Sequence, residues 1–322
     1  MTSATITRGF ATRRAAVRRL DLADYAWLIQ PVAIFLFARV LLSIATYFAE
    51  IAIPGLEGDG FWRIAPDYVL LDVWARWDSG FYVGIVERGY EFTPGVQSSV
   101  AFFPVYPLAV SLLAPALGTL AAGVVVSNVF LLGALILLYR LTELEFDADS
   151  ARRAIIYLVI FPTAFFFSAV YTESTFLFFA VGSFYFARRR MWAWAGLFAM
   201  LCSASRIVGL VVWVAIGLEF LISHGWQMAL LRRPRAMRSY VRSVLQDRLG
   251  IASLALPPLG VASYMAFLAM RFGDPVAFST VQSAWGRELV GPIELLRRDL
   301  SGLMGGDWLA GDIWWHVPLD VG

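Results

Sequence analysis

Charged and aromatic side chains crowd the stretch RWDSGFYVGIVERGY, residues 76–90 of an otherwise apolar chain. In this stretch Asp78 follows Trp77, and a carboxylate beside an apolar surface loses hydrating water, which raises its pKa and its basicity. Such a carboxylate can take the proton from a hydroxyl group whose oxygen attacks a carbon atom. Asp78 is therefore a candidate general base. Asp72 and Arg76, about one helical turn apart, are expected to form a surface ion pair with a modest structural effect.

Two further charged residues stand out because apolar stretches surround them. Arg206, in SASRIVG, has no carboxylate near it in sequence, and a charge within membrane-spanning segments is costly enough to indicate a function. Its planar guanidinium group suits a phosphate or diphosphate, and the alternative is a side chain that snorkels to the membrane interface. Glu173, in AVYTEST, is a candidate second acid or a partner for a sugar hydroxyl. Thr172 and Ser174 beside it equally favour a simple helix cap.

The composition indicates what kind of fold must position these residues. Of the 322 residues, 59% are hydrophobic and 16% are charged, whereas soluble globular chains contain roughly 25% charged residues. Apolar runs at residues 27–48, 120–139 and 155–170 approach or reach the roughly 20 residues with which a helix crosses a bilayer. The alternating pattern of a membrane barrel is missing from the sequence, so the spans are helices. We predict an all-α polytopic membrane protein.

The arginine clusters favour one topology, because basic residues in short loops stay on the cytoplasmic side. The clusters are residues 8–19, Arg140 with Arg152 and Arg153, residues 188–190 and residues 232–248. With all of them inside, about seven helices span the membrane, at residues 27–48, 120–139, 155–170, 175–187, 192–204, 207–221 and 251–270. Eight or nine spans are the alternatives. Residues 102–117, with three prolines, then form a re-entrant or interfacial helix, because another full span would move the later clusters outside.

This topology divides the single transmembrane domain, residues 1–322, into exposed segments. Residues 1–26 and 224–250 are cytoplasmic, and residues 50–100 and 271–322 are external. The polar stretches 67–91, 171–174 and 272–288 meet on the external face with the turn before Arg206, which predicts a composite site; ordinary exposed loops are the alternative. Apolar residues between Tyr68 and Ile85 recur at helical spacing and predict an amphipathic helix along the membrane surface. The aromatic residues there also suit a membrane interface.

Several residue counts exclude other classes of protein. The lone cysteine, Cys202, excludes an internal disulfide and lies in an apolar run typical of a core. The two histidines, His224 and His316, are far apart and have no carboxylate cluster at metal-ligand spacing, so we expect no metal. The net charge of +2, with no interleaved basic and aromatic residues, argues against nucleic acid. All 26 basic residues are arginine, which indicates a GC-rich genome and fits a bacterium better than a eukaryote.

Several blocks resemble one known family. WDSGFY, AFFPVYP, FPTAFFFSAVYTESTFLF, ASRIVG and FGDPVAFSTVQSAWGRE occur in the order found in the PIG-V mannosyltransferases, the second mannosyltransferases of GPI-anchor assembly, and their prokaryotic relatives. The chain departs from the pattern at Ile207, where a small polar residue is usual. It also ends at Gly322, where relatives continue with further helices, so we expect a truncated or a naturally short chain.

The resemblance implies the GT-C glycosyltransferase architecture, with an acidic catalytic residue in the first external loop and a lipid-phosphate-sugar donor. It implies that Asp78 is the catalytic carboxylate and Arg206 a contact of the donor phosphate. The remaining candidate substrate contacts are Trp77, Tyr82, Glu173, Gln282, Trp285 and Arg287, and among them Trp77, Tyr82 and Trp285 would offer flat faces to sugars. An arginine clamp can stabilise the leaving phosphate, so we expect no metal or other cofactor.

We therefore predict an inverting hexosyltransferase, specifically a mannosyltransferase. It would use a polyprenyl-phosphate-linked sugar and a lipid or glycan acceptor at the outer face of a bacterial plasma membrane. The competing prediction is a transporter or flippase of a lipid-linked saccharide, in which Asp78 and Arg206 bind without reacting and charges lie near the membrane midplane. A purely structural membrane subunit is the third. The hexose and the acceptor stay open.

Overall fold

The computed structural model describes residues 22–52 and 63–287, together with residues 293–294, 296–297 and 300–301. The regular elements in these residues are all helices. The predicted arginine cluster at residues 8–19 and His316 lie outside the described residues, as does most of the predicted external segment after residue 287.

Three helical stretches in this part of the chain are long and apolar enough to cross a membrane. They are α1 (Ala26–Ala52), α5 (Thr119–Glu145) and the stretch Arg248–Phe272, which is formed by α11 (Arg248–Leu254) and α12 (Leu256–Phe272). Three further apolar helices are shorter: α4 (Val105–Leu117), α8 (Trp192–Ser205) and α9 (Gly209–Ser223). The prediction of an all-helical membrane protein is confirmed.

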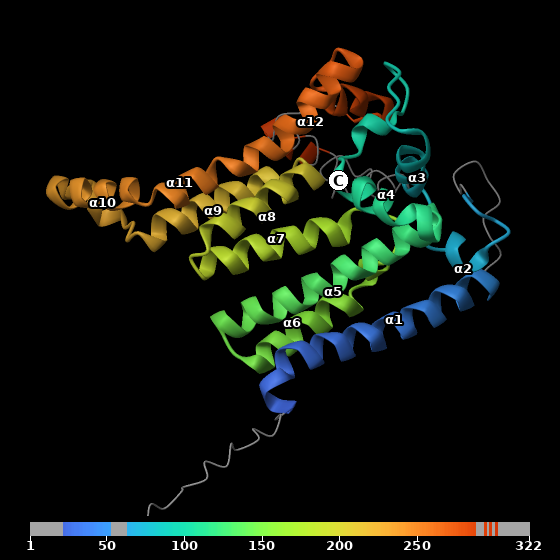
Figure 1. The fold of residues 1–322 in the computed structure, drawn as a ribbon, viewed down its shortest axis with the longest axis horizontal. Helices are drawn as coiled ribbons and strands as arrows, with labels where there is room; N and C mark the ends of the chain where they lie inside the picture. The colour runs from blue at the N-terminus through green and yellow to red at the C-terminus, as the bar shows by residue number, and fades with distance from the viewer. Residues whose placement is uncertain (1–21, 53–62, 288–292, 295, 298–299, 302–322) are drawn as a thin grey trace, which may run out of the picture.

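The long helices lie side by side and place the polar segments at two opposite ends (Figure 1). Helix α7 (Glu173–Arg188) packs between α5 and α8, α6 (Ala148–Ile160) packs on α1 and α5, and α12 packs on α8. The connections α5–α6 and α7–α8 and the helix α10 (Pro234–Gln246), which carry arginine clusters, lie at one end. The helices α2 (Val69–Asp72), α3 (Ser79–Arg88) and α4 lie at the other.

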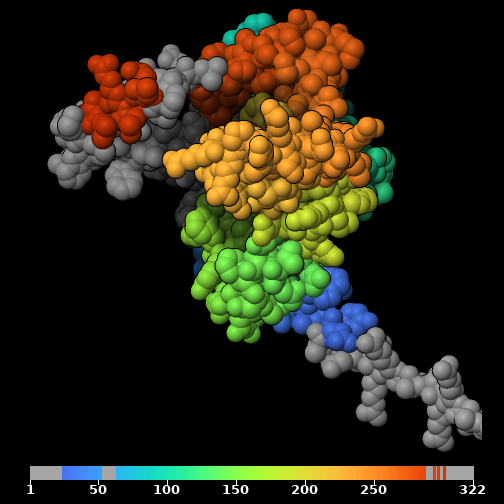
Figure 2. All heavy atoms as spheres, turned by 90° about the vertical axis from the view of Figure 1, so that its left-hand side faces the viewer, coloured from blue at the N-terminus to red at the C-terminus, as the bar shows by residue number. Residues whose placement is uncertain are grey.

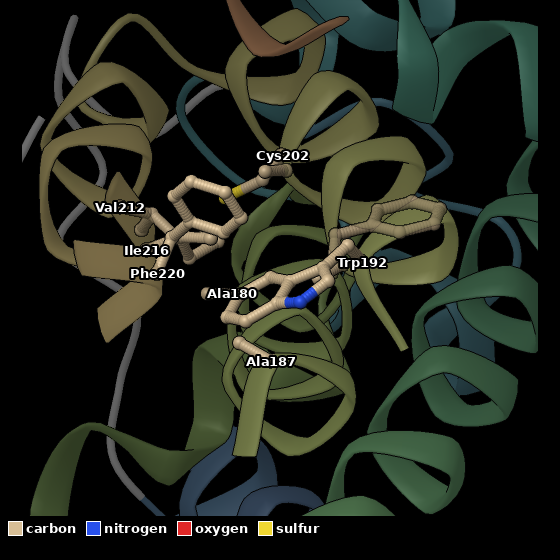
Figure 3. Packing of buried hydrophobic residues seen from close by; sticks show 10 residues of the cluster. Ala180, Ala187, Trp192, Cys202, Val212, Ile216 and Phe220 are labelled. Carbon is tan, nitrogen blue, oxygen red and sulfur yellow. The ribbon is translucent and has the colours of Figure 1, made fainter. Parts of the chain in front are cut away.

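Small and aromatic side chains fill the contact between α7, α8 and α9 (Figure 3). Cys202 is fully buried there beside Ile216 and Phe220, as its apolar surroundings predicted. Helix α8 also approaches the next helices closely, because a Cβ atom on Gly196 would lie 2.3 Å from the Ser253 carbonyl oxygen. Glycine at this contact allows the backbones to meet, as in many membrane helix pairs.

A charged side chain fastens the middle of α1 to the bundle, and the sequence reading missed it. Arg39 Nη1 donates hydrogen bonds to Ser168 Oγ (2.7 Å) and to the Ala164 carbonyl oxygen (3.4 Å). Ser168 Oγ in turn donates to Asn128 Oδ1 on α5 (2.9 Å). This polar chain ties α1 and α5 to the segment that leads into α7.

The predicted amphipathic helix between Tyr68 and Ile85 is wrong as a single surface helix. The chain forms two short helices, α2 and α3, separated by residues 73–78. Trp77 in this turn has a φ of +49°, which large L-residues seldom adopt and which cannot continue a right-handed helix. Several of the apolar side chains predicted to face lipid are buried in the protein instead, including Trp74, Ala75 and Ile85.

The predicted span at residues 155–170 is also not one helix. Helix α6 ends at Ile160 and a 3-10 helix, η3 (Pro162–Phe167), follows. Pro162 explains this end, since proline disfavours the α conformation in the residue before it. Helix α4 has 13 residues, or about 20 Å of helix, which is shorter than a bilayer core. Its re-entrant or interfacial placement and the number of spans stay predictions.

Candidate active site

The turn that carries Asp78 is anchored by a buried ion pair. Arg76 Nη2 lies 2.9 Å from Asp72 Oδ2 and 3.0 Å from Glu50 Oε1, at the end of α1. Asp72 and Arg76 are only 1% and 7% exposed, so the predicted surface pair is wrong in its location. The Ala65 backbone N–H donates to Asp72 Oδ1 over 2.8 Å, which partners the second carboxylate oxygen. Breaking a paired and buried charge is far costlier than breaking a surface pair.

A second segment, residues 170–173, lies directly against this turn. The Val170 backbone N–H donates to the Trp74 carbonyl oxygen over 2.8 Å. The Tyr171 hydroxyl donates to the Arg76 carbonyl oxygen (3.2 Å) and accepts from the Asp78 backbone N–H (3.1 Å). The blocks RWDSGFY and AVYTEST, about 95 residues apart, therefore meet as one unit. Tyr171 was missed by the sequence reading, although it stands within the block that was singled out.

The Asp78 side chain does not cap the helix that follows it. Asp78 is the N-cap residue of α3, where aspartate usually accepts a hydrogen bond from the first helical turn. Here its side chain makes no capping hydrogen bond. The carboxylate is half-buried, and its oxygens are not used to cap α3.

Arg206 and Glu173 come together from two different helices. Glu173 begins α7, and Arg206 follows the last residue of α8 in an extended conformation. Arg206 Nη1 lies 3.0 Å from Glu173 Oε1, and both side chains are largely buried, with 20% and 26% exposure. Glu173 Oε2 is buried and has no hydrogen-bond partner in the part of the chain that the structure describes. Arg206, which has no carboxylate near it in sequence, is thus paired with a carboxylate from another helix.

The charges of these residues act on one another, which defines a single electrostatic site. Burial raises the pKa of Asp78 above its ordinary value, while the positive charges of Arg287 and Arg206 lower it in part. Burial and the charge of Glu173 raise the pKa of Tyr82, with a smaller contribution from Asp78 in the same direction. The positive charges of two arginines therefore act on a carboxylate of increased basicity.

Aromatic rings from three segments form the wall of the site. Phe81 of α3 stacks on Phe102 at a centroid distance of 4.8 Å and contacts Trp285 at 5.7 Å. Trp285 ends the 3-10 helix η5 (Val281–Trp285), so this segment lies beside α3. Phe81 and Phe102 were not among the predicted site residues. The many aromatic residues in their two sequence blocks could have indicated them.

The other predicted sugar contacts differ in their accessibility. The Trp77 side chain is 44% exposed and contacts Phe166 at 6.2 Å. Tyr82 is only 5% exposed, and the rings of Phe102, Tyr106 and Tyr171 surround it. Tyr82 thus has no open ring face for a sugar in this structure.

Arg287 is held by the residue that the sequence reading grouped with it. Its Nη1 donates to Gln282 Oε1 over 3.2 Å, and Gln282 Nε2 donates to the Phe278 carbonyl oxygen over 3.1 Å. Gln282 is therefore a support for Arg287. Among the described residues, no group of three or more His, Cys, Asp or Glu side chains lies together as a metal site would require. Metal independence stays a prediction.

Comparison with known proteins assigns the chain to a family. A chain with apolar helices and a site of acidic, arginine and aromatic side chains at one end of the bundle fits a membrane-embedded transferase. The profile of the family described as Mannosyltransferase (PIG-V) matches residues 61–274, about two thirds of the chain, and the chain belongs to this family. It is therefore a glycosyltransferase that resides in a membrane. No curated protein and no solved structure matches it.

The residues of the site do not all lie within the range that the family profile matches. Asp78, Glu173 and Arg206 lie inside the matched range, whereas Gln282, Trp285 and Arg287 follow its end. Trp285 joins the site through its ring contact with Phe81 of α3. Arg287 joins it because its charge acts on Asp78, and Gln282 because it accepts a hydrogen bond from Arg287.

Proposed function

We propose that this protein is an inverting mannosyltransferase of the GT-C type. It moves mannose from a polyprenyl-phosphate-linked donor to a hydroxyl group of a lipid or glycan acceptor. The observation that carries the proposal is the Asp78 carboxylate, which is half-buried, makes no capping hydrogen bond and lies in the field of Arg206 and Arg287. Membership of the PIG-V family supports the class of reaction and the choice of hexose.

In this mechanism Asp78 acts as the base. The acceptor oxygen attacks the anomeric carbon from the face opposite the phosphate, and its proton passes to the Asp78 carboxylate. The bond between the anomeric carbon and the phosphate oxygen breaks, which releases the polyprenyl phosphate and inverts the anomeric configuration. Glycosyl transfer passes through a state that resembles an oxocarbenium ion, so the negative carboxylate also stabilises the charge that develops on the sugar.

The two arginines act on the leaving group. Arg206 presents a planar guanidinium group that suits phosphate oxygens, and Glu173 fixes its orientation through the 3.0 Å ion pair. Arg287 adds a second positive charge near Asp78 and is oriented by Gln282. Trp77 and Trp285 offer aromatic surfaces beside the base, where a sugar ring can stack.

We further propose that the site faces the exterior of a bacterial plasma membrane. The arginine-bearing connections lie at the end of the bundle opposite α2, α3 and α4 (Figure 1). Basic loops favour the cytoplasmic side, so the opposite end carries the site to the outer face. This position supports transfer over transport, because a transporter binds its substrate near the midplane.

The test is a comparison of lipid-linked glycans, by mass spectrometry, in cells with the gene, without it, and with the gene encoding Asp78→Asn. Loss of one hexose from a glycolipid in both altered strains supports the proposal. If the full glycan persists but accumulates on the inner leaflet, the protein is a transporter. An unchanged glycan pool in the deletion strain contradicts both.

A further inference from the structure

The helix α10 has an arginine face that no acidic residue of the described chain neutralises. Between Phe220 and Gln246 the sequence contains five arginines and no aspartate or glutamate. Arg235, Arg238 and Arg242 follow one another at intervals of three and four, which places them on one side of a helix. All three are exposed, and none forms a salt bridge with a residue that the structure describes.

The carboxylates at this end of the bundle already have other partners. Glu219 lies 2.9 Å from Arg188, which also pairs with Glu145. Asp247 accepts a hydrogen bond from the Gly250 backbone N–H over 2.8 Å, and its second oxygen lies 3.5 Å from His224. A partner for the arginine face would therefore come from outside these elements.

The opposite side of α10 rests on the protein, while apolar side chains stay exposed at its edges. Tyr240 contacts the Trp226 ring at 5.6 Å and donates to the Leu221 carbonyl oxygen over 3.4 Å. Val241 and Leu245 are 43% and 62% exposed, and Leu231 just before the helix is 62% exposed. A helix with arginines on one face and exposed apolar residues beside them suits a bilayer surface, where the apolar groups enter and the charges meet headgroups.

The position of α10 in the sequence puts it next to a stretch that can span the membrane. It ends two residues before Arg248, the first residue of a stretch long and apolar enough to span the membrane. Figure 2 looks onto this end of the molecule, where α10, in yellow-orange, lies in the foreground above the green connection between α5 and α6. We propose that α10 is a docking surface for anionic phospholipids, whose phosphates pair with Arg235, Arg238 and Arg242.

The experiment follows α10 with a fluorophore on the reconstituted full chain. Cys202→Ala removes the native thiol, and Leu245→Cys carries an environment-sensitive dye at the exposed edge of the helix. The protein is placed in nanodiscs of phosphatidylcholine with increasing fractions of phosphatidylglycerol. We expect a blue shift of the emission as phosphatidylglycerol increases, and its loss at about 0.5 M salt, at which charges are screened within roughly 4 Å.

The variant R235Q/R238Q/R242Q should abolish the emission shift. A weaker effect would raise the phosphatidylglycerol fraction at which the shift is half complete by on the order of tenfold. The matched control, R152Q/R153Q on α6, removes two exposed arginines from the same end and should leave the shift unchanged. Thermal unfolding checks that both variants stay folded, which is expected because the residues are exposed. A shift of equal size in pure phosphatidylcholine overturns the proposal, as does a triple variant that responds like the parent. Neither result bears on transferase activity.

Discussion

At the scale of single residues, the roles that we propose for Asp78 and Arg206 can be tested separately. Asp78 is free of helix capping and acquires basicity from burial, whereas Arg206 is oriented by a carboxylate from another helix. A general base contributes roughly 10²–10⁴-fold to rate.

Asp78→Asn should reduce turnover by about 10²–10⁴-fold, because the amide cannot take a proton. Burial raises the pKa of this carboxyl in the folded state, so the folded protein loses stability as pH rises from the ordinary value of 3.8 through the raised one. Asn removes that cost, and the melting temperature should be equal to or above that of the parent. Transfer from radiolabelled donor measures the turnover, and thermal unfolding in detergent measures the melting temperature.

The control is Glu91→Gln, whose side chain is 68% exposed and which should leave turnover and melting temperature unchanged. Turnover of Asp78→Asn within a few-fold of the parent would transfer the role of base to Glu173.

The raised pKa of Asp78 also sets a pH dependence. Only the ionised carboxylate can act as the base, so kcat/KM should fall as pH decreases through a pKa above 3.8. In Asp78→Asn the residual rate should lack this acidic limb. A pH profile of transfer by the purified protein tests this, and an acidic limb that survives in Asp78→Asn would assign it to another group.

Arg206→Ala should weaken use of the lipid donor, and Arg206→Lys should restore it only in part, because lysine has no planar fork. Glu173→Gln should weaken it by less, and in the double variant the two losses should not add, since the residues form one 3.0 Å pair. Donor dependence of the initial rate, measured for all four variants and the parent, gives this cycle. Unchanged apparent affinity for the donor in Arg206→Ala would disprove the phosphate contact.

At the scale of elements, the buried cluster of Glu50, Asp72 and Arg76 holds the α2–α3 turn on the end of α1. Asp72→Asn removes one partner of a buried pair and should cost about 3 kcal/mol of stability. The melting temperature should fall in the Asp72 variant, in contrast with Asp78→Asn. Glu87→Gln, with 48% side-chain exposure on α3, is the control. A melting temperature equal to the parent's would show that the turn is held by other contacts.

At the scale of the whole molecule, the two ends of the bundle should face opposite sides of the membrane. With Cys202 removed, a cysteine in place of the exposed Gln97 should react with an impermeant thiol reagent in intact cells. A cysteine in place of the exposed Ser239 on α10 should react only after permeabilisation. Because arginine-rich loops stay inside, we expect this pattern. The reverse pattern would place Asp78 toward the cytosol and contradict an external site.

The sequence by itself determined the class of the protein and indicated the candidate residues for its chemistry. Long apolar runs are local properties, so α1 and α5 were found close to their observed bounds. Asp78, Glu173 and Arg206 were recognisable because each is a charge in apolar surroundings, and the blocks that contain them lie in the matched family range.

Only the tertiary structure decided how these residues are paired and covered. Glu173 meets Arg206 across 33 residues, and Tyr171 bonds to the Arg76 carbonyl oxygen across 95 residues. The burial of Asp72 requires α1 and the α2–α3 turn to meet, and that of Tyr82 requires α4 and residue 171 to close over it. Helical periodicity describes which side of one helix is apolar, but it contains no information about which helix covers that side. Contacts between distant segments depend on the packing of all the helices together, and the packing therefore decided the geometry of the site.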